Sequence, residues 1–386
     1  MVSRLPYFRL SAFYLFYFAS LGAFVPYWSV YLQSLGFAPR QIGELFAIVM
    51  LTKVFAPYLW GWIADHTGSR LRIIRLAAGA AALAFAGTLL GHGYGWLALV
   101  LVAFSFFWHA VLPQFEATTI NFLGRERARY SHVRLWGSVG FIATVTGLGL
   151  WFERAPLDGL PAIMTGLLAG IWLATLLIPR SPPPPAAEDH GGAILGALRR
   201  PEVLAFLAAC FLLQASHGPY YTFFSIYLGE HGYGKGAVGQ LWALGVLAEI
   251  GVFLVFHRWL RAVGAAPLFA TAALVTSLRW VLLALWVDVL PVLLLAQVMH
   301  AASYGLYHAA AIELVNGYFP GRLQGRGQAL YASISFGLGN ALGSLLSGYA
   351  WSGLGSRATF LLAAVACALG LAVALRWLPV RRPVPA

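Results

Sequence analysis

Residues 19–47 read ASLGAFVPYWSVYLQSLGFAPRQIGELFA, and residues 215–243 read ASHGPYYTFFSIYLGEHGYGKGAVGQLWA. The two stretches align without a gap at an offset of 196 positions, and ten of the 29 pairs are identical. A second match, at an offset of 195, pairs residues 135–139 (LWGSV) with residues 330–334 (LYASI). The chain is therefore expected to consist of two similar halves.

The composition indicates what these halves are made of. Of the 386 residues, 60% are hydrophobic and only 10% are charged, whereas a soluble globular protein has about 25% charged residues. This excludes a soluble enzyme and a disordered regulator. The apolar segments, each close to the ~20 residues that a membrane span needs, lie near 8–32, 41–64, 73–91, 97–119, 133–152, 161–178, 202–228, 238–256, 267–286, 291–314, 329–351 and 358–378. We expect an all-α membrane protein with twelve transmembrane helices.

A proline-rich stretch separates the halves. Residues 180–192 read RSPPPPAAEDHGG, and four consecutive prolines cannot continue a helix. The predicted domains are an N-terminal six-helix bundle (1–178), a linker (179–200) and a C-terminal six-helix bundle (201–386). An even number of helices per half gives both copies the same orientation. Such parallel repeats are typical of secondary transporters that rock around a central site.

The net charge of +12 reports topology in such a protein. With the N-terminus inside, 19 cations fall on the inner side and 4 on the outer side, and two lie within helices. Positive charge is retained in the cytoplasm, so both termini and the linker should be cytoplasmic, in a bacterial plasma (inner) membrane, and no nucleic-acid partner is expected. The first apolar segment has no cleavage-site pattern and is expected to be retained. Cys210 and Cys367 lie in apolar stretches and should be small core residues.

The connection between the second and third segments carries a motif. It reads GWIADHTGSRLR, residues 61–72, and resembles the G-x-x-x-D-x-x-G-x-R loop of the major facilitator superfamily. The resemblance assigns a gating role to Gly61, Asp65, Gly68 and Arg70, with the Asp meeting a helix terminus or an Arg. His66 replaces the usual cation, and the equivalent HRWLR (257–261) lacks the Asp, so only one half is expected to carry the gate.

Three further segments narrow the resemblance. HVRLWGSVGF (132–141), SHGPYYTFFSIYL (216–228) and HAASYGLYHAAA (300–311) look like the 3-phenylpropionic acid transporter-like branch of that superfamily, related to the lactose permease group. The resemblance covers the whole chain. It implies the major facilitator fold and transport by alternating access, without enzymatic activity, and it specifies the solute poorly.

Several ionisable side chains lie inside the apolar segments. A charge at a helix centre costs about 2.5–3.5 kcal/mol, so these residues either line a wet path or tie helices together. They are Lys53, Glu116, Glu249, Arg279, Glu313, His109, His217, His300 and His308.

The resemblance suggests roles for some of them. Glu116 and Arg134, 18 residues apart, resemble a Glu–Arg pair that holds the sugar in lactose permease; the alternatives are a structural pair, or an Arg134 that belongs to the basic loop. Arg279 and, with an offset of about one turn, Glu249 resemble residues used for sugar binding and proton release. Lys53 aligns with Glu249 in the repeat, and both either face the path or tie the halves.

The tenth segment departs from the permease pattern. Residues 298–300 (VMH) resemble the segment with the coupling His, but Ser303 stands where the permease has a Glu. Coupling must then use Glu116, which we favour, or Glu249 or a His, or be absent. His300 and His308, eight residues apart, should share a helix face.

The seventh segment contains Gly218-Pro219, which can break a helix next to His217. Aromatic residues near this break and in the matching part of the first segment either stack on a ring of the solute or form interfacial belts. These residues are Tyr220, Tyr221, Tyr27 and Trp28.

The favoured function is proton-coupled symport of an aromatic carboxylate such as phenylpropionate. A sugar or nucleoside symporter and a drug/proton efflux antiporter remain alternatives. A membrane enzyme is disfavoured, because the G-x-S-x-G and G-x-x-x-x-G-K-[S/T] patterns and di-iron or metal-ligand patterns are missing. The expected partners are a small solute, a proton and the lipid bilayer. We expect a monomer that uses the proton gradient and no cofactor.

Overall fold

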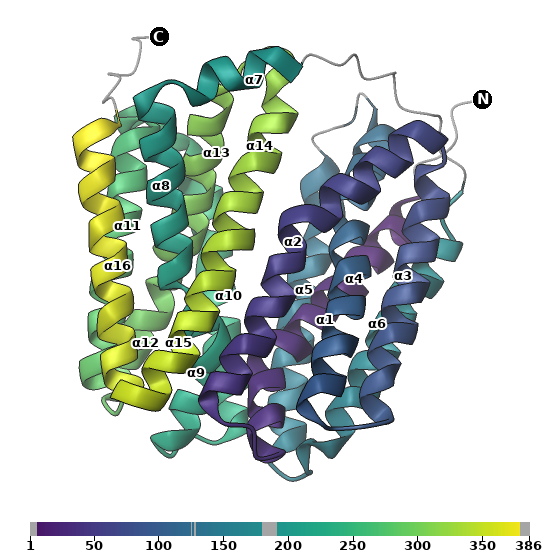
Figure 1. The fold of residues 1–386 in the computed structure, drawn as a ribbon, viewed down its shortest axis with the longest axis vertical. Helices are drawn as coiled ribbons and strands as arrows, with labels where there is room; N and C mark the ends of the chain where they lie inside the picture. Colours follow the sequence, from purple (N-terminus) through teal and green to yellow (C-terminus); the bar gives the residue numbers. More distant parts are fainter. Residues whose placement is uncertain (1–5, 125, 127–128, 180–190, 379–386) are drawn as a thin grey trace. The chain divides into compact units, whose positions relative to one another are not determined.

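The computed structural model describes residues 6–124, 126, 129–179 and 191–378, and these are helical with short connections and no strand. In chain order, the α-helices are α1 (Tyr7–Ser34), α2 (Pro39–Thr67), α3 (Arg70–Ala86), α4 (Tyr94–Leu123), α5 (Tyr130–Phe152), α6 (Leu160–Leu176), α7 (Gly191–Leu198), α8 (Pro201–Ser216), α9 (Gly218–Glu230), α10 (Lys235–Val263), α11 (Ala265–Trp286), α12 (Leu290–Val298), α13 (Tyr307–Tyr318), α14 (Gln324–Ala332), α15 (Asn340–Leu354) and α16 (Ser356–Trp377) (Figure 1). Short 3₁₀ turns occupy Gly87–Leu89, Leu157–Gly159 and Gly321–Leu323.

The prediction of twelve spans is confirmed. Twelve helical stretches of 20–31 residues within the described part are long and apolar enough to cross a membrane. Three of them combine two α-helices: α8 with α9, α12 with α13, and α14 with α15. The chain is therefore a multi-pass membrane protein.

Three spans are interrupted along their length, one by a break and two by π-helical segments. The predicted break at Gly218-Pro219 is present, because α8 ends at Ser216 and α9 begins at Gly218. Proline has no N–H to donate, so the helical hydrogen bonds are interrupted there. Two π-helical segments were not predicted: η4 (Ala301–Leu306) and η6 (Ser333–Gly339). Such segments often occur at functional sites.

The predicted linker is only partly within the described residues. The prolines at 182–185 lie outside the described part, but α7 occupies Gly191–Leu198 and is followed directly by α8. The proline content did not indicate this helix, because its effect is confined to the residues beside the prolines. The sequence AILGAL, residues 193–198, is compatible with a helix.

The described residues form two compact units. Unit 1 contains those within 1–37, 51–188 and 234–240, and unit 2 contains those within 38–50, 189–233 and 241–386. In unit 1, α1 packs on α5 and α6, and α3 packs on α4 and α6. In unit 2, α16 packs on α11 and α8, and α15 packs on α9 (Figure 1).

Each unit includes one short segment from the other half of the chain: residues 38–50 belong to unit 2 and residues 234–240 to unit 1. These two segments occupy equivalent positions in the sequence repeat. Residues 234–240 align with residues 38–44 at the offset of 196. In each segment a glycine lies very close to the backbone of the unit to which the segment belongs. A Cβ on Gly43 would lie 2.7 Å from the Ser344 carbonyl oxygen and 2.8 Å from the Gly348 Cα, and a Cβ on Gly239 would meet the Val145 carbonyl oxygen. Only glycine permits these backbones to approach so closely.

Candidate functional site

Arg279 is the central side chain of a polar cluster inside unit 2. It lies on α11 with no exposed surface. Its Nε donates to the Ala296 carbonyl oxygen at 2.7 Å, and its Nη1 donates to the Ser303 hydroxyl at 2.9 Å. Nη1 also lies 3.1 Å from Nδ1 of His300. A buried charge needs such partners, because its desolvation is otherwise costly.

Aromatic rings surround the same guanidinium. Its central carbon lies 4.2 Å from the ring centroid of Tyr220 and 4.7 Å from that of Trp280, which are cation–π distances. The Tyr220 hydroxyl donates to Oε1 of Gln297 at 3.0 Å. Nη2 of Arg279 has no hydrogen-bond partner among the described residues. The cluster therefore keeps a cationic donor in an aromatic setting.

A carboxylate completes this cluster through His300. Oε2 of Glu249 lies 4.0 Å from Nε2 of His300. Helix α10 approaches η4 closely here, since a Cβ on Gly245 would lie 3.2 Å from the His300 ring and a Cβ on Gly305 would lie 2.9 Å from Glu249 Cγ. A guanidinium only donates, so Nδ1 of His300 accepts and its ring proton is on Nε2, the nitrogen near Glu249. Glu249, His300 and Arg279 thus form one chain of polar contacts.

Aromatic rings stack on the C-terminal side of His300, along the same span. His300 and Tyr304 have centroids 5.8 Å apart at 12°, and Tyr304 and His308 have centroids 6.0 Å apart at 13°. Nδ1 of His308 lies 3.2 Å from the Tyr331 hydroxyl. The prediction that His300 and His308 share a face is confirmed.

His217 and Tyr221 lie beside this cluster. Nδ1 of His217 contacts the Leu213 carbonyl oxygen at 2.8 Å, and its ring meets Trp280 edge-on, with centroids 5.0 Å apart. Tyr221 stacks on His217 at 5.8 Å and on Trp242 at 6.4 Å. The break between α8 and α9 therefore brings both predicted aromatic positions, Tyr220 and Tyr221, to the Arg279 cluster.

Unit 1 contains the second predicted group. Glu116 on α4 accepts a hydrogen bond from the Tyr130 hydroxyl at 3.2 Å, and Lys53 on α2 is near enough to interact with it electrostatically. The Arg134 guanidinium lies 3.7 Å from the Phe18 ring centroid. Tyr130, at the start of α5, is thus the side chain that donates to Glu116.

The loop motif adopts a defined turn. Gly68 has a φ of 61°, a left-handed conformation that favours glycine, between the end of α2 and the start of α3. Nη2 of Arg70 donates to Oδ1 of Asp65 at 2.9 Å. A Cβ on Gly61 would lie 3.3 Å from the Gln114 side chain. The Asp65 carboxylate is half exposed (51%) and meets a nearby Arg.

Three residues that the sequence analysis discussed, a tryptophan and the two cysteines, lie outside the polar clusters described above. Trp28 is fully buried in the aromatic interior of unit 1, where it packs against Phe24, Tyr31 and Phe85. Cys210 and Cys367 are buried and free, as expected of core residues.

Several contributors to the clusters were not singled out from the sequence. They are Tyr130, Trp280, Gln297 and Tyr304. Gln297 carries the clearest signal, because it is a polar residue in an apolar span and precedes His300 by one turn. Trp280 directly follows Arg279. The described residues contain no group of three or more His, Cys, Asp or Glu side chains that would hold a metal ion.

Comparisons with known proteins agree with this architecture. Residues 7–362 match the MFS_1 like family. The chain is 31% identical over 363 residues to a probable 3-phenylpropionic acid transporter of Escherichia coli (strain K12), covering 92% of this chain and 93% of that protein. It is 26% identical to maltose permease of Geobacillus stearothermophilus, covering 95% and 94%.

Solved structures share the fold. The crystal structure of the nucleoside transporter NupG matches with a TM-score of 0.81 at 17% identity, covering 97% of this chain and 99% of that chain. An inward-facing, unoccupied bacterial homolog of the human lysosomal transporter Spinster matches with a TM-score of 0.73 at 15% identity, covering 99% of both. The chain therefore belongs to the MFS_1 like family, within the major facilitator superfamily, and is a secondary transporter and not an enzyme.

Proposed function

We propose that this protein is a proton-coupled symporter of an aromatic monocarboxylate of the phenylpropionate type. The observation that carries the proposal is the Arg279 guanidinium, which is fully buried against the rings of Tyr220 and Trp280 and keeps Nη2 without a hydrogen-bond partner among the described residues. A carboxylate is the ligand that satisfies a guanidinium best, through charge-assisted hydrogen bonds.

The surroundings of Arg279 match the rest of such a solute. Tyr220 and Tyr304 both pack against His300, with centroid distances of 5.4 and 5.8 Å, and Trp242 lies 4.7 Å from Tyr220. Aromatic pairs gain energy from offset or edge-to-face contact beyond the area they bury. A phenyl ring attached to the bound carboxylate would find such partners here. The name of the 31% identical relative supports the same solute class.

Proton coupling is proposed to occur next to the solute. A carboxylate bound to Arg279 competes for the guanidinium that now donates to Nδ1 of His300. Releasing His300 from that contact makes it a better base, and Glu249 lies 4.0 Å from the other ring nitrogen. Solute and proton would then favour each other, as symport requires. Glu116, with Tyr130 and Lys53 beside it, is the alternative carrier that the sequence favoured.

The membrane setting completes the proposal. The proposed setting is a monomer in a bacterial plasma membrane. Both termini are proposed to be cytoplasmic, because that orientation puts 19 cations on the inner side and 4 on the outer side. Alternating access would expose the cluster to either side in turn.

A sugar or nucleoside is the second candidate, and one contact favours it. Nε2 of the buried Gln297 has no hydrogen-bond partner among the described residues, while its Oε1 accepts from Tyr220. A side-chain amide beside an arginine suits a solute with several hydroxyl groups. The maltose permease relative is in keeping with this class.

Competition for uptake distinguishes these classes. Proteoliposomes would be loaded with labelled 3-phenylpropionate in the presence of unlabelled 3-phenylpropionate, its amide, a nucleoside or maltose. We expect competition by the acid alone and a loss of uptake in Arg279→Gln, with Arg376→Gln on α16 as the matched control. Competition by the amide as strong as by the acid would contradict a carboxylate site, and competition by the nucleoside or maltose alone would favour the second candidate.

A further inference from the structure

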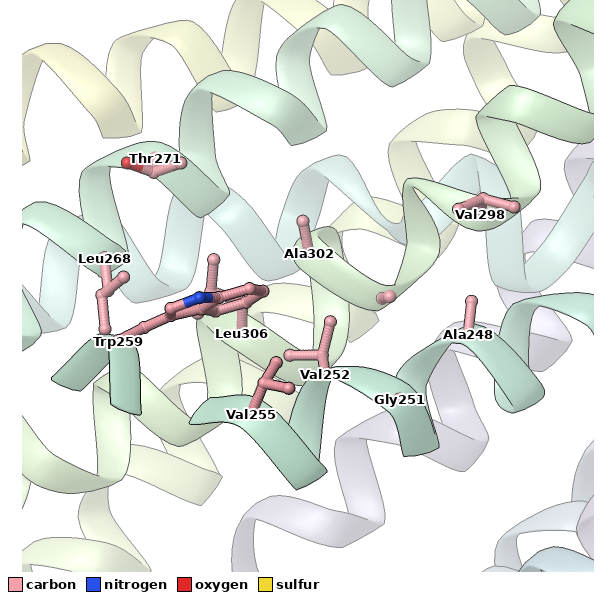
Figure 2. A pocket seen from close by; sticks show the side chains of 11 residues that line it. Ala248, Gly251, Val252, Val255, Trp259, Leu268, Thr271, Val298, Ala302 and Leu306 are labelled. Atoms are coloured by element: carbon pink, nitrogen blue, oxygen red, sulfur yellow. The ribbon is translucent and has the colours of Figure 1, made fainter. Parts of the chain in front are cut away.

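An apolar groove lies in unit 2, beside the span that carries the polar contacts of Arg279. It has a volume of about 530 Å³ and is bordered by α10, α11 and the span that contains α12 and η4. Figure 2 shows Trp259 and Leu268 at one end and Ala248 and Val298 at the other. Thr271 supplies the only hydroxyl group among the lining residues.

The groove exists because its floor is made of small residues. Ala248 and Gly251 on α10 oppose Ala301 and Ala302 on η4. A Cβ added to Gly251 would meet nothing within 4 Å, so no described part of this chain fills the space there. Gly251 is itself exposed, so the space is open at the surface, and an open groove lined by apolar side chains is suited to a flexible apolar ligand.

Exposed apolar side chains flank the groove on α10 and α12. Leu247, Phe253 and Leu254 on α10 are 54%, 45% and 79% exposed, and Leu295 on α12 is 53% exposed. All four lie within spans long and apolar enough to cross a membrane. Exposed leucine and phenylalanine at these positions are stable only against lipid chains or another apolar surface.

The length of the groove corresponds to one leaflet. Ala248 and Trp259 are 11 residues apart on α10, which at ~1.5 Å per residue is about 16 Å. Half of a hydrocarbon core of ~30 Å is about 15 Å. Trp259 lies at the end of the groove nearest the end of α10, and tryptophan favours the membrane–water interface.

Positive charge at the Trp259 end of the groove favours a lipid with an anionic head group. Arg258 and Arg261 flank Trp259 and are exposed. The sequence from 250 to 287 contains no Asp or Glu that would neutralise them. Basic residues close to the cytoplasmic leaflet attract anionic lipids, and the topology proposed above puts this end of α10, with its two arginines, on the cytoplasmic side.

We propose that an anionic phospholipid with a phosphatidylglycerol head group binds in this groove. One acyl chain lies along Ala248, Gly251 and Val255 against Ala301 and Ala302, and the phosphate is held by Arg258 and Arg261. Ala248 precedes Glu249 and Ala301 follows His300, so the bound chain packs directly beside the two backbone segments that carry the polar cluster.

Photo-cross-linking tests the site without measuring transport. The purified protein would be placed in phosphatidylcholine vesicles that contain phosphatidylglycerol with a diazirine in one acyl chain, and the labelled peptides would be mapped by mass spectrometry. We expect the label within residues 248–259 and 298–306, and we expect unlabelled phosphatidylglycerol to displace it. Label spread evenly over the lipid-facing helices would overturn the proposal.

Variants of the groove and of its charged end make the test specific. Ala302→Phe fills the groove and should abolish the label, whereas Leu254→Phe, on the same face but outside the groove, should leave it unchanged. Gly251→Leu serves as a second filling variant if the first is not inserted. The double variant Arg258→Gln and Arg261→Gln should reduce labelling by phosphatidylglycerol to the level of the matched phosphatidylcholine probe. Equal labelling by the two probes in the unmodified protein, or a label unchanged by filling the groove, would overturn the proposal.

Discussion

Nη1 of Arg279 and Nδ1 of His300 lie 3.1 Å apart, on two different spans of unit 2 and with less than a tenth of either residue exposed. Because the guanidinium can only donate, this contact makes His300 an acceptor at Nδ1 and orients its ring proton toward Glu249. A solute that takes over the guanidinium changes the state of the histidine directly. The pair therefore connects the proposed binding group to the proposed proton carriers.

The first prediction concerns coupling. Glu249→Gln removes a titratable group but keeps its size, so it should still exchange labelled for unlabelled solute while no longer accumulating solute under a pH difference. The measurement compares counterflow with pH-driven uptake in the same proteoliposomes. Glu313→Gln, on α13, is the control for a glutamate in the same unit of the protein.

Glu116→Gln in the same assay decides between the two carboxylates. If it loses accumulation and keeps exchange while Glu249→Gln accumulates normally, the proton is carried in unit 1, where Tyr130 donates to Glu116, and the coupling proposed for His300 is wrong.

The loop motif yields a second prediction. Asp65→Asn weakens the 2.9 Å contact with Arg70 and removes the charge at the end of α2. We expect the protein to insert normally, to transport more slowly and to favour the inward-open state, which accessibility of introduced cysteines on the two sides would report. Asp158→Asn, in a 3₁₀ turn, is the matched control. A normal transport rate in Asp65→Asn would refute the gating role.

Topology can be tested by labelling. The two native cysteines are buried, so they should contribute little background when an impermeant thiol reagent is added to intact cells. His190→Cys, at a position outside the described residues, should be protected, and Lys235→Cys, at the start of α10, should be labelled. The reversed pattern would contradict cytoplasmic termini.

Close backbone packing gives a prediction about stability. In Gly43→Ala the new methyl group meets backbone atoms of Ser344 and Gly348 at 2.7–2.8 Å, and neither can move without shifting α15. We expect a loss of about 1–3 kcal/mol, the usual cost of overpacking, measured as a lower midpoint of thermal unfolding in detergent. Gly147→Ala on α5 meets nothing within 4 Å and should be neutral or slightly stabilising. Equal midpoints for the two variants would show that α2 does not need the glycine.

The sequence predicted the spans well because membrane helices leave a strong and local signal. Apolar runs of the required length and the Gly-Pro at 218–219 were sufficient to place all twelve spans and the break in the seventh. The π-helical segments were not predicted, since the composition of residues 301–306 and 333–339 does not distinguish them from an ordinary apolar α-helix.

The site was predictable only where charge marks it. Arg279, Glu249 and His300 stand out as ionisable residues in apolar spans, and the structure brings them together. Tyr130, Tyr304 and Trp280 do not stand out among the 57 aromatic residues of the chain, 26 Phe plus 14 Trp plus 17 Tyr. The repeat motif marked Trp28 as a candidate, whereas its side chain packs in the interior of unit 1.

Accumulation of labelled 3-phenylpropionate in proteoliposomes under an inward-directed proton gradient tests the central claim most directly. The account predicts that the unmodified protein accumulates more solute than protein-free liposomes, in which the neutral acid enters by diffusion alone. This excess should collapse when a proton uncoupler is added, and Arg279→Gln should show no excess. Uptake that only equilibrates, or accumulation that survives the uncoupler or the loss of Arg279, would contradict it.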